Sequence, residues 1–366
     1  MKHIYIACGG TGGHLTPGIA LAQELERRGH KITLSISSKS VDRRLCEHYP
    51  IFNFVPVPGC AFSWHPVGLC KFALGALRAF IWGWKHLGKH RQSVVISFGG
   101  FSAVGLCLAA FVRRRPIFLH EANLHMGRAI RCLAPLAKKV YLPPKLKESA
   151  KYQRKAEYVP MNYPVRRDFL PLPRASARKL LKLPNWGKCL VVSGGSQGAS
   201  VLVDWVRGHG TQLANLGYHV ICLTGLGGME MKTQLQGVAG KIYHIRYETF
   251  SDYVNVLHSA ADLAICRAGA GTIAELIRGQ TPSILVPYPT ATGDHQTLNA
   301  RAHAEAGMAI LLPQNQLAEL FPTVEALDDG ALQSMRKNLS KFAKSVGNPA
   351  AALADDIMAS WPAEND

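Results

Sequence analysis

The stretch from His3 to Ser37 decides the fold, and it reads HIYIACGGTGGHLTPGIALAQELERRGHKITLSIS. It opens with an apolar run typical of a buried strand, which leads directly into a glycine-rich turn. Thr16 and Pro17 are the residue types of a helix cap and a first helical position, and apolar residues follow at helical spacing as far as Gly29. The closing run KITLSIS predicts a second strand. A strand, a glycine turn, a helix and another strand form the opening of a doubly wound α/β domain.

The same pattern starts again at residue 188. The run KCLVVS predicts a buried strand, GGSQG follows it as a turn, and a helix is expected from about Ala199. Further strands are expected at HVICLTG, KIYHIRY, DLAICRAG and PSILVPYP. Two glycine turns about half a chain apart, each after a strand, predict two similar α/β halves.

A proline-rich stretch separates the two halves, with prolines at 160, 164, 171 and 173. We therefore predict a first domain over residues 1–162 and a second over 163–366. The final segment NPAAALADDIMASW predicts a helix that could pack on either domain. The length of 366 residues agrees with two domains of roughly 150 residues or more. With 48% hydrophobic and 18% charged residues, disorder is excluded as the main state.

The cysteines indicate a reducing compartment. The chain has nine, none in a C-x-x-C spacing, and most lie inside apolar runs. Buried free thiols are therefore favoured over disulfides or structural zinc, and we expect no metal and no cofactor. The first residues, MKHIYIACGG, lack the basic region and apolar core of a signal peptide, so we expect the protein on the cytoplasmic side.

The net charge of +18 is concentrated in one half of the chain. Residues 1–165 hold 24 Lys or Arg against 7 Asp or Glu, whereas the remainder holds 18 against 17. An excess of this size favours nucleic acid or an anionic membrane as a partner. Aromatic RNP motifs and zinc-finger spacings are absent, so we expect no nucleic-acid partner, although the charge alone leaves that alternative open.

Residues 59–91 combine aromatic, aliphatic and cationic side chains. A helix of this composition suits the headgroup region of an anionic bilayer. An ordinary core helix with a solvated cationic face fits the pattern equally well. No stretch reaches the 18 or more uncharged apolar residues of a spanning helix, so membrane contact would be peripheral.

Three glycine-rich segments are candidates for anion binding, because glycine lets a ligand approach backbone N–H groups at a helix start. The first is GGTGGH, which is neither a dinucleotide fingerprint nor a P-loop, and its His14 could be a base or could simply pack beneath the turn. The second, GGSQGA, adds the side-chain donors of Ser196 and Gln197. The third, CRAGAGTIAEL, places Glu275 where it could accept ribose hydroxyls or merely compensate the helix dipole.

Taken together, these motifs resemble the MurG family of peptidoglycan glycosyltransferases. The matching signatures run in the family's order from residue 9 to residue 300: GGTGGHLTPGIALA, FGGFSAVG, HEAN, YPVR, GGSQGA, CRAGAGTIAEL and DHQTLNA. The family's usual G-N-P-V-R reads MNYPVR here, so either Asn162 is displaced or Tyr163 fills the Asn position. The resemblance implies the GT-B fold, two Rossmann-like doubly wound domains facing a cleft, with the acceptor on the first domain and the sugar nucleotide on the second.

The resemblance also implies roles for individual residues. The donor, UDP-N-acetylglucosamine, would contact Arg166, Ser196, Gln197, the backbone at Ser251, the amides of Ala270, Gly271 and Thr272, and Glu275, His295 and Gln296. Asn123 would reach the sugar from the other domain. The diphosphate of the undecaprenyl-linked acceptor would lie against Thr11, Gly12, Gly13, Gly99 and Gly100. His14 and Glu121 are the ionisable residues of these acceptor-side motifs, and His14 is our candidate base.

The implied reaction is an inverting transfer of N-acetylglucosamine to the 4-hydroxyl of lipid-linked N-acetylmuramoyl-pentapeptide, at the cytoplasmic face of the inner membrane. Backbone amides and a helix N-terminus would stabilise the leaving UDP, so the reaction needs no metal in principle. A UDP-N-acetylglucosamine 2-epimerase, or a transferase with a soluble acceptor, shares the donor-side features. The basic, apolar first half argues against a soluble acceptor.

Overall fold

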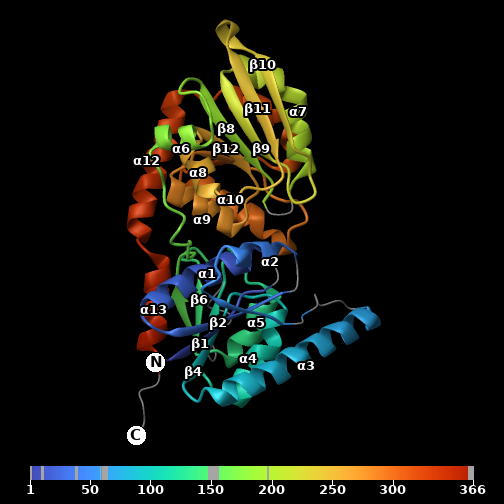
Figure 1. Cartoon of the computed structure of the whole chain (residues 1–366), viewed down its shortest axis with the longest axis vertical. Helices are drawn as coiled ribbons and strands as arrows, with labels where there is room; N and C mark the ends of the chain where they lie inside the picture. Colours follow the sequence, from blue (N-terminus) through green and yellow to red (C-terminus); the bar gives the residue numbers. More distant parts are fainter. Residues whose placement is uncertain are drawn as a thin grey trace. The chain divides into compact units, whose positions relative to one another are not determined.

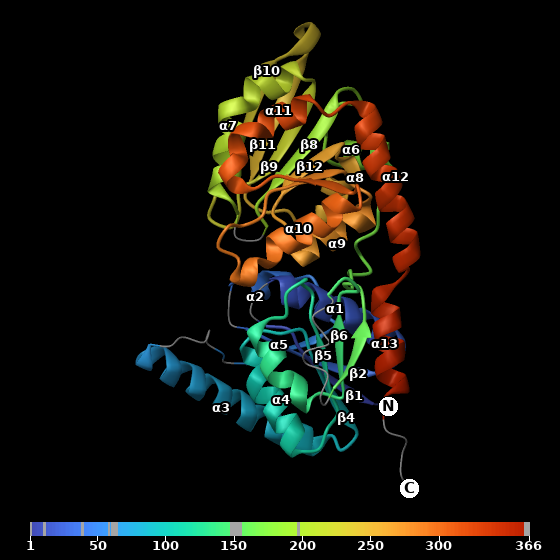
Figure 2. The same ribbon diagram turned by 180° about the vertical axis from the view of Figure 1, so that it is seen from behind.

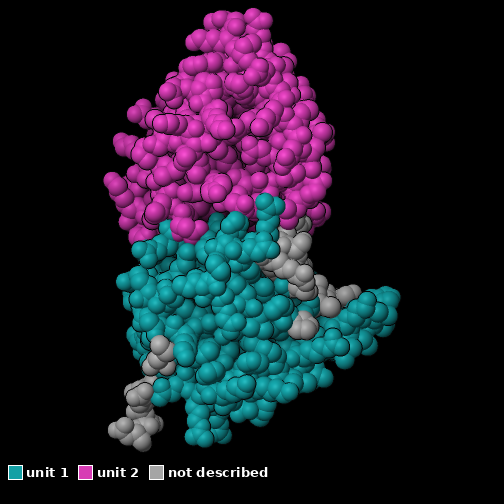
Figure 3. Space-filling view, in the orientation of Figure 1, with its two compact units in different colours: residues 1–167, 348–366 teal, residues 168–347 magenta. Residues whose placement is uncertain are grey.

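The computed structural model describes residues 2–9, 12–37, 40–57, 59, 65–146, 156–195 and 198–361, with the backbone alone at 12 and 40–43. The chain forms two compact units, which Figure 3 distinguishes by colour. The first comprises Met1–Arg167 and Asn348–Asp366, and the second Asp168–Gly347. The boundary thus lies after Arg167 rather than after residue 162, because the segment that follows the last strand of the first unit still packs on that unit.

The first unit is built on a parallel sheet (Figure 1). Within the described residues its seven strands run in the order β3-β2-β1-β4-β5-β6-β7. Their bounds are β1 (His3–Ala7), β2 (Lys31–Ile36), β3 (Asn53–Pro56), β4 (Ser93–Ser97), β5 (Ile117–His120), β6 (Lys139–Leu142) and β7 (Glu157–Pro160). The predicted doubly wound order is confirmed, since β1 lies between β2 and β4 and the chain winds outward in both directions.

Helices cover both faces of this sheet, because β1 buries side chains in both directions. Ile4 and Ile6 pack on one core cluster, which α1 and α13 cover, while Tyr5 and Ala7 pack on the other, beneath α3, α4 and α5. The helices are α1 (Gly12–Arg27), α2 (Ser40–Glu47), α3 (Pro66–Lys89), α4 (Ser102–Val112), α5 (Arg128–Leu133) and α13 (Pro349–Ala359), with a 3₁₀ turn η1 (Ala134–Leu136).

The prediction for the start of the first helix was wrong. Thr16 and Pro17 lie inside α1, which begins at Gly12. Proline has no N–H to donate and so reads as a first helical residue, but a helix can extend upstream of it when another group satisfies the carbonyl four residues before. The glycine-rich turn is therefore partly helical.

The C-terminal helix α13 belongs to the first unit, where Figure 2 shows it beside α1. Leu353 and Ile357 are fully buried in the first unit's core. Asp356 accepts hydrogen bonds from Lys139 Nζ at 3.0 Å and from the Tyr141 hydroxyl at 2.7 Å. Burial, and then the Asp356 carboxylate, raise the pKa of Tyr141. Of the two placements that the sequence left open for this helix, the structure has the one on the first unit.

The second unit repeats the architecture with one addition. Its described sheet has the order β10-β11-β9-β8-β12-β13-β14 and is parallel except for β10, which pairs antiparallel with β11. The strands are β8 (Lys188–Ser193), β9 (Tyr218–Leu223), β10 (Met231–Gln236), β11 (Ile242–Glu248), β12 (Leu263–Cys266), β13 (Ser283–Leu285) and β14 (Ala309–Leu311). We did not predict β10, because its sequence MKTQLQ has only two apolar residues, Met231 and Leu235, and lacks the continuous apolar run of the predicted strands.

Its helices again cover both faces, because Leu190 and Val192 of β8 point into one core cluster and Cys189 and Val191 into another. The helices are α6 (Arg174–Leu180), α7 (Ser200–Asn215), α8 (Val254–Ala260), α9 (Ala270–Gly279), α10 (His295–Glu305), α11 (Leu320–Glu325) and α12 (Asp329–Val346). Short 3₁₀ turns lie at η3 (Val238–Gly240), η4 (Thr292–Asp294) and η5 (Gln314–Glu319).

The described cysteines are free thiols, and five of them are buried: Cys8, Cys107, Cys189, Cys222 and Cys266. Burial raises the pKa of the Cys107 and Cys266 thiols to about 12. Thiols of this kind are protonated at neutral pH and behave as small apolar side chains.

Candidate functional site

In the first unit, the predicted acceptor-side residues gather at the carboxyl edge of the sheet, where β1, β4 and β5 end. His14, on the first turns of α1, lies against Gly99 and Gly100, which follow β4. These glycines have φ of +97° and +83°, and a Cβ built on Gly99 would lie 3.3 Å from His14 Nε2. Glycine is therefore required there both for the backbone conformation and for the approach of the imidazole ring.

The carboxyl group of Glu121 holds together the loop that follows β5. Its Oε1 accepts hydrogen bonds from the backbone N–H groups of Ala122 and Asn123, both at 2.9 Å, and from Asn123 Nδ2 at 3.2 Å. Its Oε2 accepts from the Gly127 N–H at 2.7 Å. Glu121 is only 5% exposed and both oxygens are bound within its own loop. Its geometry is that of a group that orients Asn123 rather than one turned toward a substrate.

His120, the last residue of β5, forms the floor beneath this loop. Its ring is 1% exposed and packs on Phe98, with ring centroids 5.1 Å apart. Burial lowers its pKa to about 4, so the ring is neutral at physiological pH. The neighbouring His14 is half-buried and accessible by comparison.

Arg166 lies in the first unit, whereas we predicted it in the second domain. Its Nη1 donates to the Tyr49 hydroxyl at 3.0 Å. The next residue, Arg167, donates its backbone N–H to Gln23 Oε1 at 2.7 Å. These bonds explain the later boundary, since they fasten the segment before Asp168 to α1 and to the loop that follows α2.

In the second unit, the donor-side residues that the structure describes follow the carboxyl ends of β11, β12 and β13. Ala270, Gly271 and Thr272 form the first turn of α9, preceded by Gly269, which has no side chain to cap it. The cap residue thus offers no side-chain acceptor to the first N–H groups of that turn, and a phosphate can accept from them. Glu275 follows one turn later and is half-buried. Thr11, Ser196 and Gln197 lie outside the described residues.

Gln296 links the two loops of this edge. Its Oε1 accepts from the N–H of Ala268, at 3.2 Å, and from the N–H of Tyr288, at 2.9 Å. Asn299, one turn later on α10, donates from Nδ2 to the Ala268 carbonyl at 3.2 Å. His295 Nδ1 lies 2.8 Å from the Thr292 carbonyl, which directs Nε2 away from its own helix. The amide group of Gln296 is thereby held in place by its oxygen.

Arg267 is a feature whose role the sequence did not reveal. It is 8% exposed, and its Nη1 donates to the carbonyls of Val286 and Pro287 at 3.2 and 3.1 Å. Among the residues that the structure describes, no carboxylate forms an ion pair with it. Burial lowers its pKa, although a guanidinium stays charged. A buried positive charge directly before the first turn of α9 adds to that turn's preference for an anion.

Ser251 lies in the loop between β11 and α8, where its Oγ accepts from the Tyr253 N–H at 3.2 Å. That bond shapes the turn before α8.

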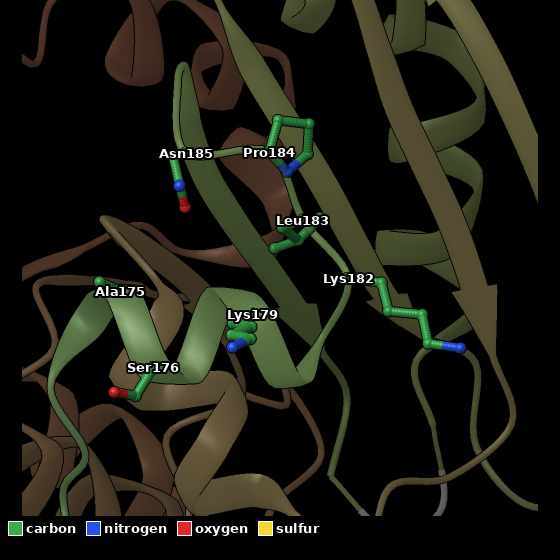
Figure 4. A pocket seen from close by; sticks show the side chains of 7 residues that line it. All are labelled: Ala175, Ser176, Lys179, Lys182, Leu183, Pro184 and Asn185. Carbon is green, nitrogen blue, oxygen red and sulfur yellow. The ribbon is translucent and has the colours of Figure 1, made fainter.

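A depression of about 610 Å³ on the second unit lies elsewhere (Figure 4). It is lined by Ala175, Ser176, Lys179, Lys182, Leu183, Pro184 and Asn185. These residues precede β8, so the depression lies at the amino end of that strand. Because ligands of open parallel sheets bind at the carboxyl edge, we do not assign it to the site.

Family models match both units. The glycosyltransferase family 28 N-terminal domain matches residues 4–142, and the family's C-terminal domain matches residues 189–356. Among solved structures, MurG of Acinetobacter baumannii superposes with a TM-score of 0.71 at 23% identity, over 98% of this chain and 100% of that one. A calicheamicin glycosyltransferase superposes with a TM-score of 0.66 at 17% identity, over 98% of each chain. The predicted GT-B fold is confirmed.

Relatives found by sequence share a higher identity with this chain than these structures do. A UDP-N-acetylglucosamine--N-acetylmuramyl-(pentapeptide) pyrophosphoryl-undecaprenol N-acetylglucosamine transferase of Opitutus terrae is 44% identical, over 93% of this chain and 91% of its own length. The transferase of the same name from Thermus thermophilus is 35% identical, over 96% of this chain and 98% of its own. With this identity over nearly the whole length, the chain is a glycosyltransferase and belongs to the MurG family.

Proposed function

We propose that the protein transfers N-acetylglucosamine from UDP-N-acetylglucosamine to the 4-hydroxyl of undecaprenyl-diphosphate-linked N-acetylmuramoyl-pentapeptide. The observation that carries this proposal is the 44% identity, over 93% of the chain, to a relative named for that reaction. The described geometry supports it, because each unit presents backbone N–H groups and glycines at the carboxyl edge of its sheet.

On the donor side, the first turn of α9 would hold the diphosphate, with the buried Arg267 charge behind it. Glu275 would accept the ribose hydroxyls, and Ser251, Ser196 and Gln197 would complete the nucleotide site. His295 and Gln296 would hold the sugar. As UDP leaves, negative charge develops on the diphosphate, and preorganised N–H donors stabilise it without moving.

On the acceptor side, His14 is the proposed base. In a single displacement, the acceptor 4-hydroxyl oxygen forms a bond to the anomeric carbon, the bond to UDP breaks, and the hydroxyl proton passes to His14. Glu121 is the weaker candidate because both its oxygens are bound within its own loop. Its role in this proposal is to hold the loop that carries Asn123.

Membrane association is the second part of the proposal, and α3 supports it. This helix turns Gly75, Ala79 and Gly83 toward α4, which it approaches so closely that a Cβ on Gly105 would meet the Ala76 carbonyl oxygen. Many of its large apolar side chains face outward, whereas Leu87 is buried and Phe80 and Trp82 pack against the core. Figure 1 shows the helix extending from the rest of the first unit. An ordinary core helix has the opposite arrangement.

The outward apolar surface continues onto α4. We call it the α3–α4 patch, and its members are each at least 38% exposed: Leu69, Leu74, Leu77, Ile81 and Trp84 of α3, and Leu108, Phe111 and Val112 of α4. Exposed Lys71, Arg78, Lys85 and Lys89 lie among them, and Arg113 packs its guanidinium 3.8 Å from the centre of the Trp84 ring. Apolar area bordered by cations suits the headgroups of an anionic bilayer.

α3 has 24 residues and, by length and composition, is apolar enough to cross a membrane. Only 17% of its most apolar 18-residue stretch is buried. Its cations argue for the surface of the bilayer, since a charge at the bilayer centre costs about 2.5 kcal/mol or more. We therefore propose a peripheral enzyme on the cytoplasmic face of the inner membrane.

UDP release in the presence and absence of a lipid-linked acceptor analogue tests the proposed reaction. We expect release to depend on the acceptor, and His14→Ala to lower kcat by at least a hundredfold with little change in the KM for UDP-N-acetylglucosamine. Acceptor-independent conversion of the donor would instead indicate an epimerase. Near-normal kcat in His14→Ala would remove His14 as the base.

A further inference from the structure

The hydroxyl group of Tyr163 reaches α1 from the segment that leads out of β7. It donates to the Gly13 carbonyl at 3.1 Å, and it lies 2.7 Å from Thr16 Oγ1. A phenol has one proton, and here the Gly13 carbonyl accepts it. The Thr16 hydroxyl must therefore donate to the Tyr163 oxygen. The two bonds form a relay from Thr16 through Tyr163 to Gly13.

Pro17 explains why the Gly13 carbonyl takes a donor from outside the helix. In α1 the carbonyl of residue 13 would accept the N–H of residue 17, and proline has none. Tyr163 supplies a hydrogen bond in place of the one that the backbone cannot make. This bond allows α1 to begin at Gly12, upstream of its proline.

The turn that Tyr163 holds carries the acceptor-side groups. His14 lies between Gly13 and Thr16 in the sequence, so both hydrogen-bonded residues flank the proposed base. The same segment is fastened to α1 again by the bond from the Arg167 N–H to Gln23. A reacting group displaced by about 1 Å can lose a hundredfold in rate, so the placement of this turn bears directly on turnover.

We propose that Tyr163 is a positioning residue for the acceptor side of the reaction, acting through the Thr16–Tyr163–Gly13 relay on the turn that carries His14. The proposal rests on the proposed function, because it takes His14 as the base. Tyr163 contacts neither substrate in this proposal. Its effect is on the placement of the turn and so on kcat, not on binding of the sugar nucleotide.

Four single variants of the full chain, and the Tyr163→Phe/Thr16→Val double variant, test this relay. Tyr163→Phe removes the hydroxyl and keeps the ring, Thr16→Val removes the other hydroxyl, and Thr16→Ser keeps it. Tyr158→Phe, in β7 of the same unit, is the matched control. For each variant we would measure kcat, the KM for UDP-N-acetylglucosamine, and hydrogen exchange of the amides in the first two turns of α1.

We expect Tyr163→Phe and Thr16→Val each to lower kcat about three- to tenfold, as the loss of one or two hydrogen bonds would. The KM for UDP-N-acetylglucosamine should stay within twofold of the wild type. The double variant should lose no more than either single one, and Thr16→Ser and Tyr158→Phe should retain wild-type kcat. Amide exchange in α1 should quicken in Tyr163→Phe.

Faster exchange with wild-type kcat in Tyr163→Phe would show a purely structural contact and overturn the proposal. Unchanged exchange would overturn it as well, and so would additive losses in the double variant. An inactive wild type would refute the proposed function, and this proposal with it, before any variant is made. An active wild type with an equally active Tyr163→Phe would refute this proposal alone.

Discussion

The side-chain oxygen of Gln296 accepts the backbone N–H of Tyr288 at 2.9 Å and so connects α10 to the loop that follows β13. The same oxygen accepts the Ala268 N–H, directly before α9. One side chain therefore fixes the spacing of two loops at the proposed donor site. Its orientation follows from these bonds, because an amide oxygen that accepts two N–H groups places its NH₂ group on the opposite side.

Replacing Gln296 with Ala should therefore affect both the sugar contact and the loops. We expect kcat/KM for UDP-N-acetylglucosamine to fall by about 10- to 100-fold, since two loop hydrogen bonds and one ligand contact are lost. Gln212→Ala, at an exposed position of α7, is the control and should leave kcat/KM unchanged. Steady-state kinetics with varied donor would measure both. A Gln296→Ala enzyme as active as the control would exclude this role.

Glu275→Ala separates a ribose contact from simple compensation of the helix dipole. If the carboxylate accepts ribose hydroxyls, the KM for UDP-N-acetylglucosamine should rise at least tenfold while the free energy of unfolding changes by less than about 1 kcal/mol. Glu305→Ala, on the exposed side of α10, serves as its control. A loss of stability in Glu275→Ala with unchanged KM would favour the dipole role.

The α3–α4 patch should bind vesicles that contain anionic lipid. Replacing Leu77 and Ile81 with Glu should abolish flotation with such vesicles at low salt, because it puts negative charges into the contact surface. Ile51→Glu changes a side chain that is also exposed, at 68%, but lies outside the patch, so it should float normally. If the wild type failed to bind at low salt, the membrane assignment would be wrong.

Buried histidines, among them His120 and His258, should make the fold sensitive to mild acid. Burial lowers the pKa of His120 in the first unit, and of His258 in the second, to about 4 from an ordinary value of 6.5. Below pH 6.5 the unfolded chain binds these protons and the folded chain does not until about pH 4, so stability is full above pH 6.5 and falls between these values. Each group contributes up to about 1.4 kcal/mol per pH unit.

Urea unfolding at pH 7.5 and 5.0 measures this loss. His258→Gln should reduce the difference in unfolding free energy between the two pH values, whereas His48→Gln, at an exposed position, should leave it unchanged. A His258→Gln protein with the wild-type pH dependence would show that other groups account for it.

Much of this molecule could be predicted from its sequence, because both halves follow the strand, glycine turn and helix pattern. The strands predicted at His3 and Lys188 each lie inside a largely parallel sheet, with side chains buried on both faces. The start of α1 was mispredicted because Pro17 reads as a first helical residue, while the hydroxyl that satisfies Gly13 comes from residue 163. Contacts between distant residues leave no local pattern.

The sequence predicted which residues form the candidate site better than it predicted what each residue does. Glu121 could be named from the sequence only as an ionisable residue of the HEAN motif, whereas the structure shows that four donors of its own loop bind it. In the sequence, Arg267 could be recognised only as the end of a strand. In the structure it is buried, and no carboxylate among the described residues forms an ion pair with it. The sequence likewise could not decide which way the α3 side chains point. The spacing of Gly75, Ala79 and Gly83 identifies a contact face only once α4 is seen to pack against it.

Product analysis tests the central claim most directly. The wild-type protein would be incubated with UDP-N-acetylglucosamine and an undecaprenyl-diphosphate-linked N-acetylmuramoyl-pentapeptide analogue, and the lipid product analysed by mass spectrometry and by NMR of the new glycosidic bond. We predict a lipid-linked disaccharide with one added N-acetylglucosamine, joined at the 4-hydroxyl with inverted anomeric configuration, and UDP in equal amount. An unmodified lipid, with the donor intact, hydrolysed or epimerised, would contradict the claim.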